Sequence, residues 1–109
     1  MGTVILIILL LCSLADLYDG HGDYSGAEVL YKQCLAKMKA VLGKTHPTTL
    51  GTMKTIASLY FRQGKYCKAE LLLNRCLAKM MVVLGESHPD TEATLLFLSF
   101  VERKRSMHN

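Results

Sequence analysis

The sequence lacks the groups of residues that mark most enzymes. It has no nucleophile placed beside a base, no paired carboxylates at catalytic spacing and no glycine-rich phosphate loop. Ser58 is expected on a helix, with no histidine near it. We therefore predict that the chain is not an enzyme, with no catalytic residues and no cofactor.

No two cysteines form a CxxC pair, the commonest sign of a zinc or redox site. The four cysteines are Cys12, Cys34, Cys67 and Cys76. His46 and His88 follow Cys34 and Cys76 at the same spacing, which puts each histidine beyond the far end of the helix expected to carry the cysteine. Zinc needs ligands that converge, so we expect no metal site. Free cysteine behaves as a small apolar residue, and Cys34 and Cys76 are predicted to be buried thiols.

The sequence also has no concentrated basic stripe. Its formal charge is +4, and the basic residues are spread along the chain apart from ERKR at Glu102–Arg105. Proteins that bind nucleic acids usually gather Lys and Arg on one face. We expect no nucleic-acid partner.

The longest apolar run, Val4–Leu11, has no basic residue before it. A run of this length is too short to span a bilayer, and no stable membrane span is expected. Ser13 and Ala15 would fit a signal-peptidase site, but Leu14–Tyr18 already belongs to the repeat described next. Two interpretations stay open: a cytoplasmic protein that begins with an apolar helix, and a secreted one if residues 1–15 are a signal peptide.

One unusual hexapeptide occurs twice. LGKTHP at Leu42–Pro47 returns as LGESHP at Leu84–Pro89. When the chain is shifted onto itself by that interval, nearly half of the positions from Leu14 to Thr55 are identical. Such a match is an internal repeat, and a repeat decides the fold class.

Each repeat has the apolar spacing of two helices. Ala69, Leu73, Cys76 and Met80 lie on one helical face, and Gly85 after this stripe is suited to a left-handed helix end. Proline four residues later suits a helix start, so LGxxHP is a helix stop followed by a start. The predicted helices are about Val4–His21, Tyr24–Leu42, Pro47–Gln63, Tyr66–Leu84 and about Pro89–Arg105.

The pattern LYxxxGxYxxAExLxxxCL, with a small residue before LY, resembles the tetratricopeptide repeat (TPR). The 42-residue period and the LGxxHPxT link resemble the longer subtype of kinesin light chains, whereas the common period is 34. The resemblance implies an all-α solenoid of antiparallel helix pairs, wound as a right-handed superhelix. It implies a single TPR domain over residues 1–109, with repeats at about 6–47 and 48–89 and a partial repeat or capping helix at 90–105.

The resemblance also implies a protein-binding groove lined by the first helix of each pair. An adaptor that binds a partner protein or peptide is the function expected from it. One end of the groove is acidic and the other basic, which favours a ligand with acidic residues toward the carboxy-terminal half. The implied groove residues are Asp16, Asp19, Lys54, Ser58, Phe61, Arg62, Phe100, Arg103 and Lys104.

The chain departs from the kinesin light chain pattern in three ways. The Asn-Asn pair that can hold a ligand's backbone is replaced by Cys12-Ser13, Lys54-Thr55 and Leu96-Phe97. There is no heptad segment for a motor subunit. Both end helices are apolar around most of their surface, and a terminal cap should be polar outside. The alternative function is therefore a fragment of a longer array that self-assembles through its terminal helices.

Overall fold

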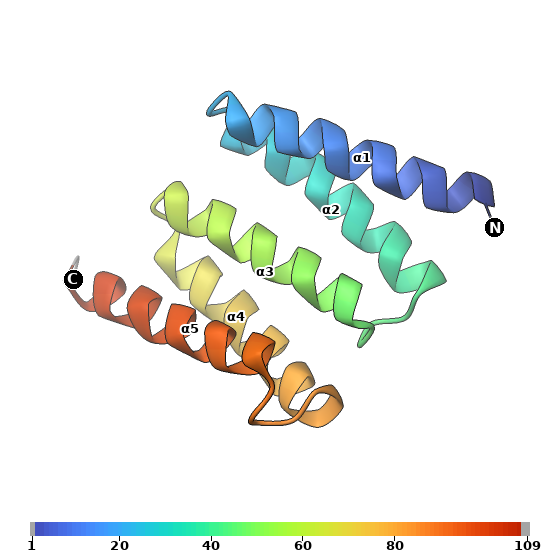
Figure 1. The fold of residues 1–109 in the computed structure, drawn as a ribbon. Helices are drawn as coiled ribbons and strands as arrows, with labels where there is room; N and C mark the ends of the chain where they lie inside the picture. The colour runs from blue at the N-terminus through green and yellow to red at the C-terminus, as the bar shows by residue number, and fades with distance from the viewer. Residues whose placement is uncertain (1, 108–109) are drawn as a thin grey trace. The chain divides into compact units, whose positions relative to one another are not determined.

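The computed structural model describes residues 2–107, which form five α-helices and no strand (Figure 1). The all-α prediction is confirmed, and no predicted helix end differs from the observed one by more than two residues. The helices pack as sequential antiparallel pairs. They are α1 (Gly2–Gly20), α2 (Tyr24–Val41), α3 (Pro47–Arg62), α4 (Tyr66–Val83) and α5 (Pro89–Met107).

Glycine ends the helices where the repeat places it. Gly43 after α2 has φ +102° and Gly85 after α4 has φ +91°, the left-handed conformation that a side chain disfavours. The turn after α3 uses Gly64 in the same way, with φ +80°. The predicted helix stops are therefore confirmed.

The histidine of each LGxxHP link caps the next helix. Nδ1 of His46 accepts a hydrogen bond from the backbone N–H of Thr48 at 3.1 Å, and Nδ1 of His88 accepts one from Asp90 at 3.1 Å. Backbone N–H groups in a first turn have no partner within the helix, and the imidazole supplies one. The link thus combines a glycine stop, a histidine cap and a proline start.

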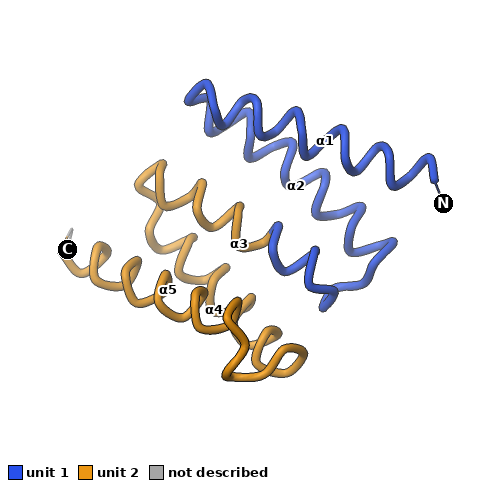
Figure 2. Tube along the Cα trace, viewed as in Figure 1, with its two compact units in different colours: residues 1–52 blue, residues 53–109 orange. Residues whose placement is uncertain are grey.

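The described chain divides into two compact units, residues 1–52 and residues 53–109 (Figure 2). The boundary falls within α3. Unit 1 holds α1, α2 and the first turns of α3, and unit 2 holds the rest of α3 with α4 and α5. Each unit has its own buried apolar residues, among them Ile8, Tyr31 and Cys34 in unit 1 and Ile56, Leu73 and Val101 in unit 2.

The repeat is reproduced in the contacts of the core. The hydroxyl of Thr52 lies 3.1 Å from the sulfur of Met38 in unit 1, and that of Thr94 lies 3.2 Å from the sulfur of Met80 in unit 2. Both methionines are buried, as their place on the apolar stripe predicts. Equivalent residues therefore make equivalent contacts in the two units.

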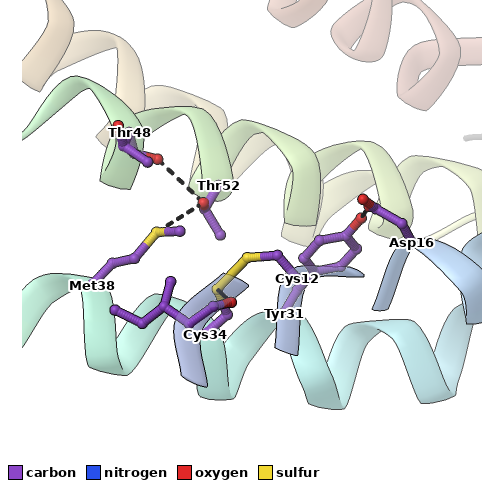
Figure 3. The surroundings of a disulfide bond; sticks show 8 residues. Cys12, Asp16, Tyr31, Cys34, Met38, Thr48 and Thr52 are labelled. Atoms are coloured by element: carbon purple, nitrogen blue, oxygen red, sulfur yellow. Dashed lines mark hydrogen bonds between the residues drawn. A yellow bond between two sulfur atoms is a disulfide. The ribbon is translucent and has the colours of Figure 1, made fainter. Parts of the chain in front are cut away.

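The prediction for Cys34 needs correction. Its side chain is fully buried, as expected, but its sulfur is bonded to Cys12 of α1 (Figure 3). The two Cα atoms are 6.3 Å apart, within the range that a disulfide spans. Cys76 is a buried thiol that forms no disulfide, as predicted, and Cys67 is an exposed thiol outside any disulfide.

The apolar amino-terminal helix is longer than its run of aliphatic residues. By length and composition alone, α1 is able to cross a membrane, with a mean hydropathy of 1.9. The expectation that this segment is too short was wrong, because it counted only Val4–Leu11. The helix is 19 residues long, close to the length that a bilayer requires.

Candidate protein-binding surface

The predicted groove residues fall at repeated positions on α1, α3 and α5, the first helix of each pair. Residues separated by one repeat period share a place on these helices. The two positions filled in all three helices are Asp16, Ser58 and Phe100, and Asp19, Phe61 and Arg103.

An aromatic cluster joins the three helices of unit 2. The ring of Phe61 on α3 lies 5.3 Å from Tyr66 on α4, and on α5 it lies 5.9 Å from Phe97 and 5.4 Å from Phe100, between ring centroids. The planes are tilted or edge-on, the geometries that aromatic pairs prefer. The structure thus brings together two predicted site residues, Phe61 and Phe100. Phe61 is half-buried, whereas 44% of Phe100 is exposed.

One basic side chain lies over the exposed ring, and two others are close to the cluster in sequence. The ammonium of Lys104 lies 5.7 Å from the centroid of Phe100, close enough for a cation–π contact. Arg103 on α5 and Arg62 at the end of α3 are both exposed. This part of unit 2 therefore combines an accessible aromatic face with positive charge. We define the aromatic–basic surface as Phe61, Arg62, Phe100, Arg103 and Lys104.

Lys54 and Ser58 lie earlier on α3 and are half-buried. Burial raises the pKa of the Cys76 thiol to about 11, and the positive charges of Lys54 and Lys79 partly oppose this rise. The thiol is therefore protonated at neutral pH and is a poor nucleophile. Lys54, one of the predicted groove residues, is therefore close enough for its charge to act on the interior cysteine.

The two acidic predicted residues belong to unit 1. Asp16 accepts a hydrogen bond from the hydroxyl of Tyr31 on α2 (Figure 3). Its carboxylate therefore also ties α1 to α2. Asp19, a half-buried residue, lies near the end of α1. The acidic end of the predicted groove is thus part of a different compact unit from the aromatic–basic surface.

Two features of unit 2 were not predicted from the sequence: the other members of the aromatic cluster, and an ion pair between α4 and α5. Tyr66 and Phe97 complete the cluster around Phe61, and only the apolar character of the last helix pointed toward Phe97. Arg105 on α5 donates to Glu70 on α4 at 2.5 Å, beside an open hollow that Cys67 and Leu71 complete. No helical spacing links Glu70 to Arg105, so sequence alone gave no sign of this pair.

Within residues 2–107, no group of three or more His, Cys, Asp or Glu side chains is arranged to hold a metal ion. The repeated histidines His46 and His88 are exposed and half-buried, respectively, and each is used by the backbone of the following helix.

Comparison with known proteins supports the repeat assignment. Residues 6–81 match the family described as tetratricopeptide repeat. The chain also resembles a crystal structure from Podosopora anserina, described as nearly identical TPR-like repeats of a provisionally assigned kinesin light chain, with 24% identity and a TM-score of 0.79. The match covers 92% of this chain and 47% of that one, so this chain spans about half its length. No curated protein matches the chain. With the family match covering most of the sequence, the chain belongs to the tetratricopeptide repeat family.

Proposed function

We propose that this chain is a non-catalytic adaptor that binds a partner protein or peptide through the aromatic–basic surface of unit 2. TPR domains are in general protein-interaction modules. The observation that carries the proposal is Phe100, a partly exposed aromatic ring that packs against Phe61 and has the Lys104 ammonium over it.

This combination of residues favours a particular ligand chemistry. Aromatic side chains and arginine are enriched where interfaces draw most of their binding energy. An apolar ligand side chain would pack on Phe100, and ligand carboxylates would pair with Arg62, Arg103 and Lys104. Arginine suits this role because its planar guanidinium can bind a carboxylate through two hydrogen bonds. The expected ligand is an acidic segment with an apolar anchor.

The lack of the Asn-Asn pair bears on affinity. Lys54-Thr55 and Leu96-Phe97 replace it in unit 2, so the side chains that would hold a ligand's backbone are missing. Binding must then depend mainly on charge and on the aromatic ring. Interactions between exposed charges weaken as salt rises, and we expect binding to weaken in the same way.

The experiment is selection from a displayed random-peptide library against the whole chain. We expect the selected peptides to be rich in Asp and Glu around one apolar residue. The double variant Arg62→Glu/Arg103→Glu should weaken the best peptide by about tenfold to a hundredfold, because each substitution both removes an attraction and adds a repulsion. Isothermal titration measures the change.

The control is Arg75→Glu/Lys79→Glu, which makes the same change of charge on α4. It should leave the affinity within about twofold. A selection without acidic bias, or equal loss of binding in the two double variants, would rule out this surface as the site. Circular dichroism checks that both variants keep their helices.

A second candidate is self-assembly through the terminal helices. On α5, Leu95 and Leu96 are exposed, although terminal repeats usually need a polar outer face. Sedimentation velocity over a hundredfold range of concentration tests it. A larger species that Leu96→Glu removes would favour self-assembly, and a monomer throughout would contradict it.

A further inference from the structure

The outward surface of α1 is apolar and exposed, whereas its inner face packs against α2. Ile8 is buried against Cys34 and Met38 of α2, and Val4 and Leu11 pack around them. Outside this packed face lie six exposed aliphatic residues along the first four turns, Ile5, Leu6, Ile7, Leu9, Leu10 and Leu14.

Part of this surface is what the repeat would cover with a preceding helix. Leu10 and Leu14 occupy the positions that Thr94 and Leu98 occupy on α5, two repeat periods later. In unit 2 those residues are buried, and α5 contacts the preceding helix α4. On α1, 69% of Leu10 is exposed.

A preceding helix does not account for the exposure of Leu6 and Leu9. Leu6 and Leu9 occupy the positions of Asp90 and Ala93 on α5, which are exposed. On α1, 61% of Leu6 and 57% of Leu9 are exposed. A docked helix would cover Leu10 and Leu14 and leave Leu6 and Leu9 in water. An apolar medium that surrounds the whole outward side of α1 would cover all four residues.

Charge is divided between the two ends of unit 1. Its acidic residues lie between Asp16 and Glu28, and its basic residues between Lys32 and Lys44. Because α1 and α2 are antiparallel, the end of α2, which carries Lys39, lies at the same end of unit 1 as the start of α1 (Figure 1), and Val4 and Val41 pack on one cluster there. Lys44 follows in the link that runs on to α3. The uncharged apolar turns of α1 therefore lie at the end of unit 1 that also carries the exposed Lys39 and Lys44. Apolar and basic side chains together favour binding to anionic membrane surfaces.

We propose that α1 binds the surface of an anionic lipid membrane. Leu6, Leu9 and Leu10 enter the boundary between headgroups and acyl chains, and Lys39 and Lys44 contact the lipid phosphates or carboxylates. The helix lies along the membrane and does not cross it, because crossing would separate it from α2, to which the disulfide of Cys12 binds it. This site is independent of the aromatic–basic surface in unit 2.

The test is co-sedimentation of the purified, oxidised whole chain with vesicles. We expect binding to phosphatidylcholine vesicles that contain one-third phosphatidylserine and much weaker binding to phosphatidylcholine alone. The variant Leu6→Glu/Leu10→Glu should lose at least roughly a hundredfold in affinity, since two leucines no longer leave water. The variant Lys39→Gln/Lys44→Gln should lose roughly tenfold or more, on anionic vesicles only.

Matched controls lie in unit 2. Leu71 and Val82 are also exposed aliphatic residues on a helix, and Leu71→Glu/Val82→Glu should bind as the wild type does. Lys65→Gln/Lys68→Gln makes the same change of charge as the lysine variant and should have little effect.

Three results would overturn the proposal. The first is equal binding of the wild type and Leu6→Glu/Leu10→Glu. The second is a vesicle-independent dimer that this variant abolishes, which would make the face an interface between two copies. The third is binding that appears only after the disulfide is reduced, since α1 would then have to leave α2.

Discussion

At the scale of residues, four buried threonines divide into two kinds. Thr49 and Thr91 hold equivalent positions in consecutive repeats, and neither hydroxyl has a hydrogen-bond partner. Three residues later, Thr52 and Thr94 each donate to a backbone carbonyl one turn earlier and lie against a methionine sulfur. Residues of one type therefore differ in what they contribute to stability.

We predict opposite effects for the same substitution at Thr91 and Thr94. Thr91→Val should raise the free energy of unfolding by up to about 1 kcal/mol, because it removes a buried hydroxyl without a partner. Thr94→Val should lower it by about 1 kcal/mol, because a hydrogen bond is lost. Urea denaturation of both variants measures the difference, and equal effects would contradict the assigned hydrogen bonds.

From the sequence, it was easier to predict which side chains are buried than which of them form a covalent bond. The apolar stripe correctly placed Met38, Met80 and Cys76 in the interior. It did not pair Cys12 with Cys34, although the two stand at similar distances on either side of the turn between their helices. The similar distance of the two cysteines from the turn between α1 and α2 was the signal that could have predicted the disulfide. It was missed because Cys12 has no cysteine equivalent in the second repeat, where a lysine stands.

At the scale of elements, the glycine at the end of α2 has a different role from the one within α3. Gly43 has φ +102°, and Gly51 lies in helical backbone. A Cβ atom would meet nothing within 4 Å at either position, so only backbone conformation separates them.

Gly43→Ala should therefore destabilise the protein by about 1–2 kcal/mol, the cost of placing a side chain in the left-handed region. Gly51→Ala should stabilise it by up to about 1 kcal/mol, because alanine favours the helix. Thermal unfolding of the two variants provides the measurement. A loss of stability in both would show that space, not backbone conformation, limits these sites.

The disulfide fixes one element to another, α1 to α2. Its two cysteines are separated by 22 residues in sequence. Closing a loop of this size lowers the entropy of the unfolded chain and so raises the free energy of unfolding by about 3 kcal/mol. Cys12→Ser should thus reduce the stability of the oxidised protein by about this amount, and reductant should then have no further effect on it. Cys67→Ser is the control, with unchanged stability. If reductant left the wild type's urea midpoint unchanged, the bond would not form in solution.

At the scale of the whole molecule, the repeat explains how much could be predicted. Two copies of one pattern fixed the helices, because the glycine, histidine and proline of the first LGxxHP link recur in register in the second. The candidate binding surface could be predicted from the repeat only in part. Candidate groove positions could be assigned by repeat register, but the contact of Phe61 with Phe97 and Phe100 joins residues with no shared repeat position.

Hydrogen exchange of the whole chain, with and without the selected acidic peptide, tests directly whether the aromatic–basic surface binds the ligand. If the peptide binds there, exchange should slow at the end of α3, around Phe61 and Arg62, and along α5 from Phe100 to Lys104. No change is expected on α4 around Arg75 and Lys79. Protection confined to α4, or to unit 1 alone, would contradict a binding site on the aromatic–basic surface.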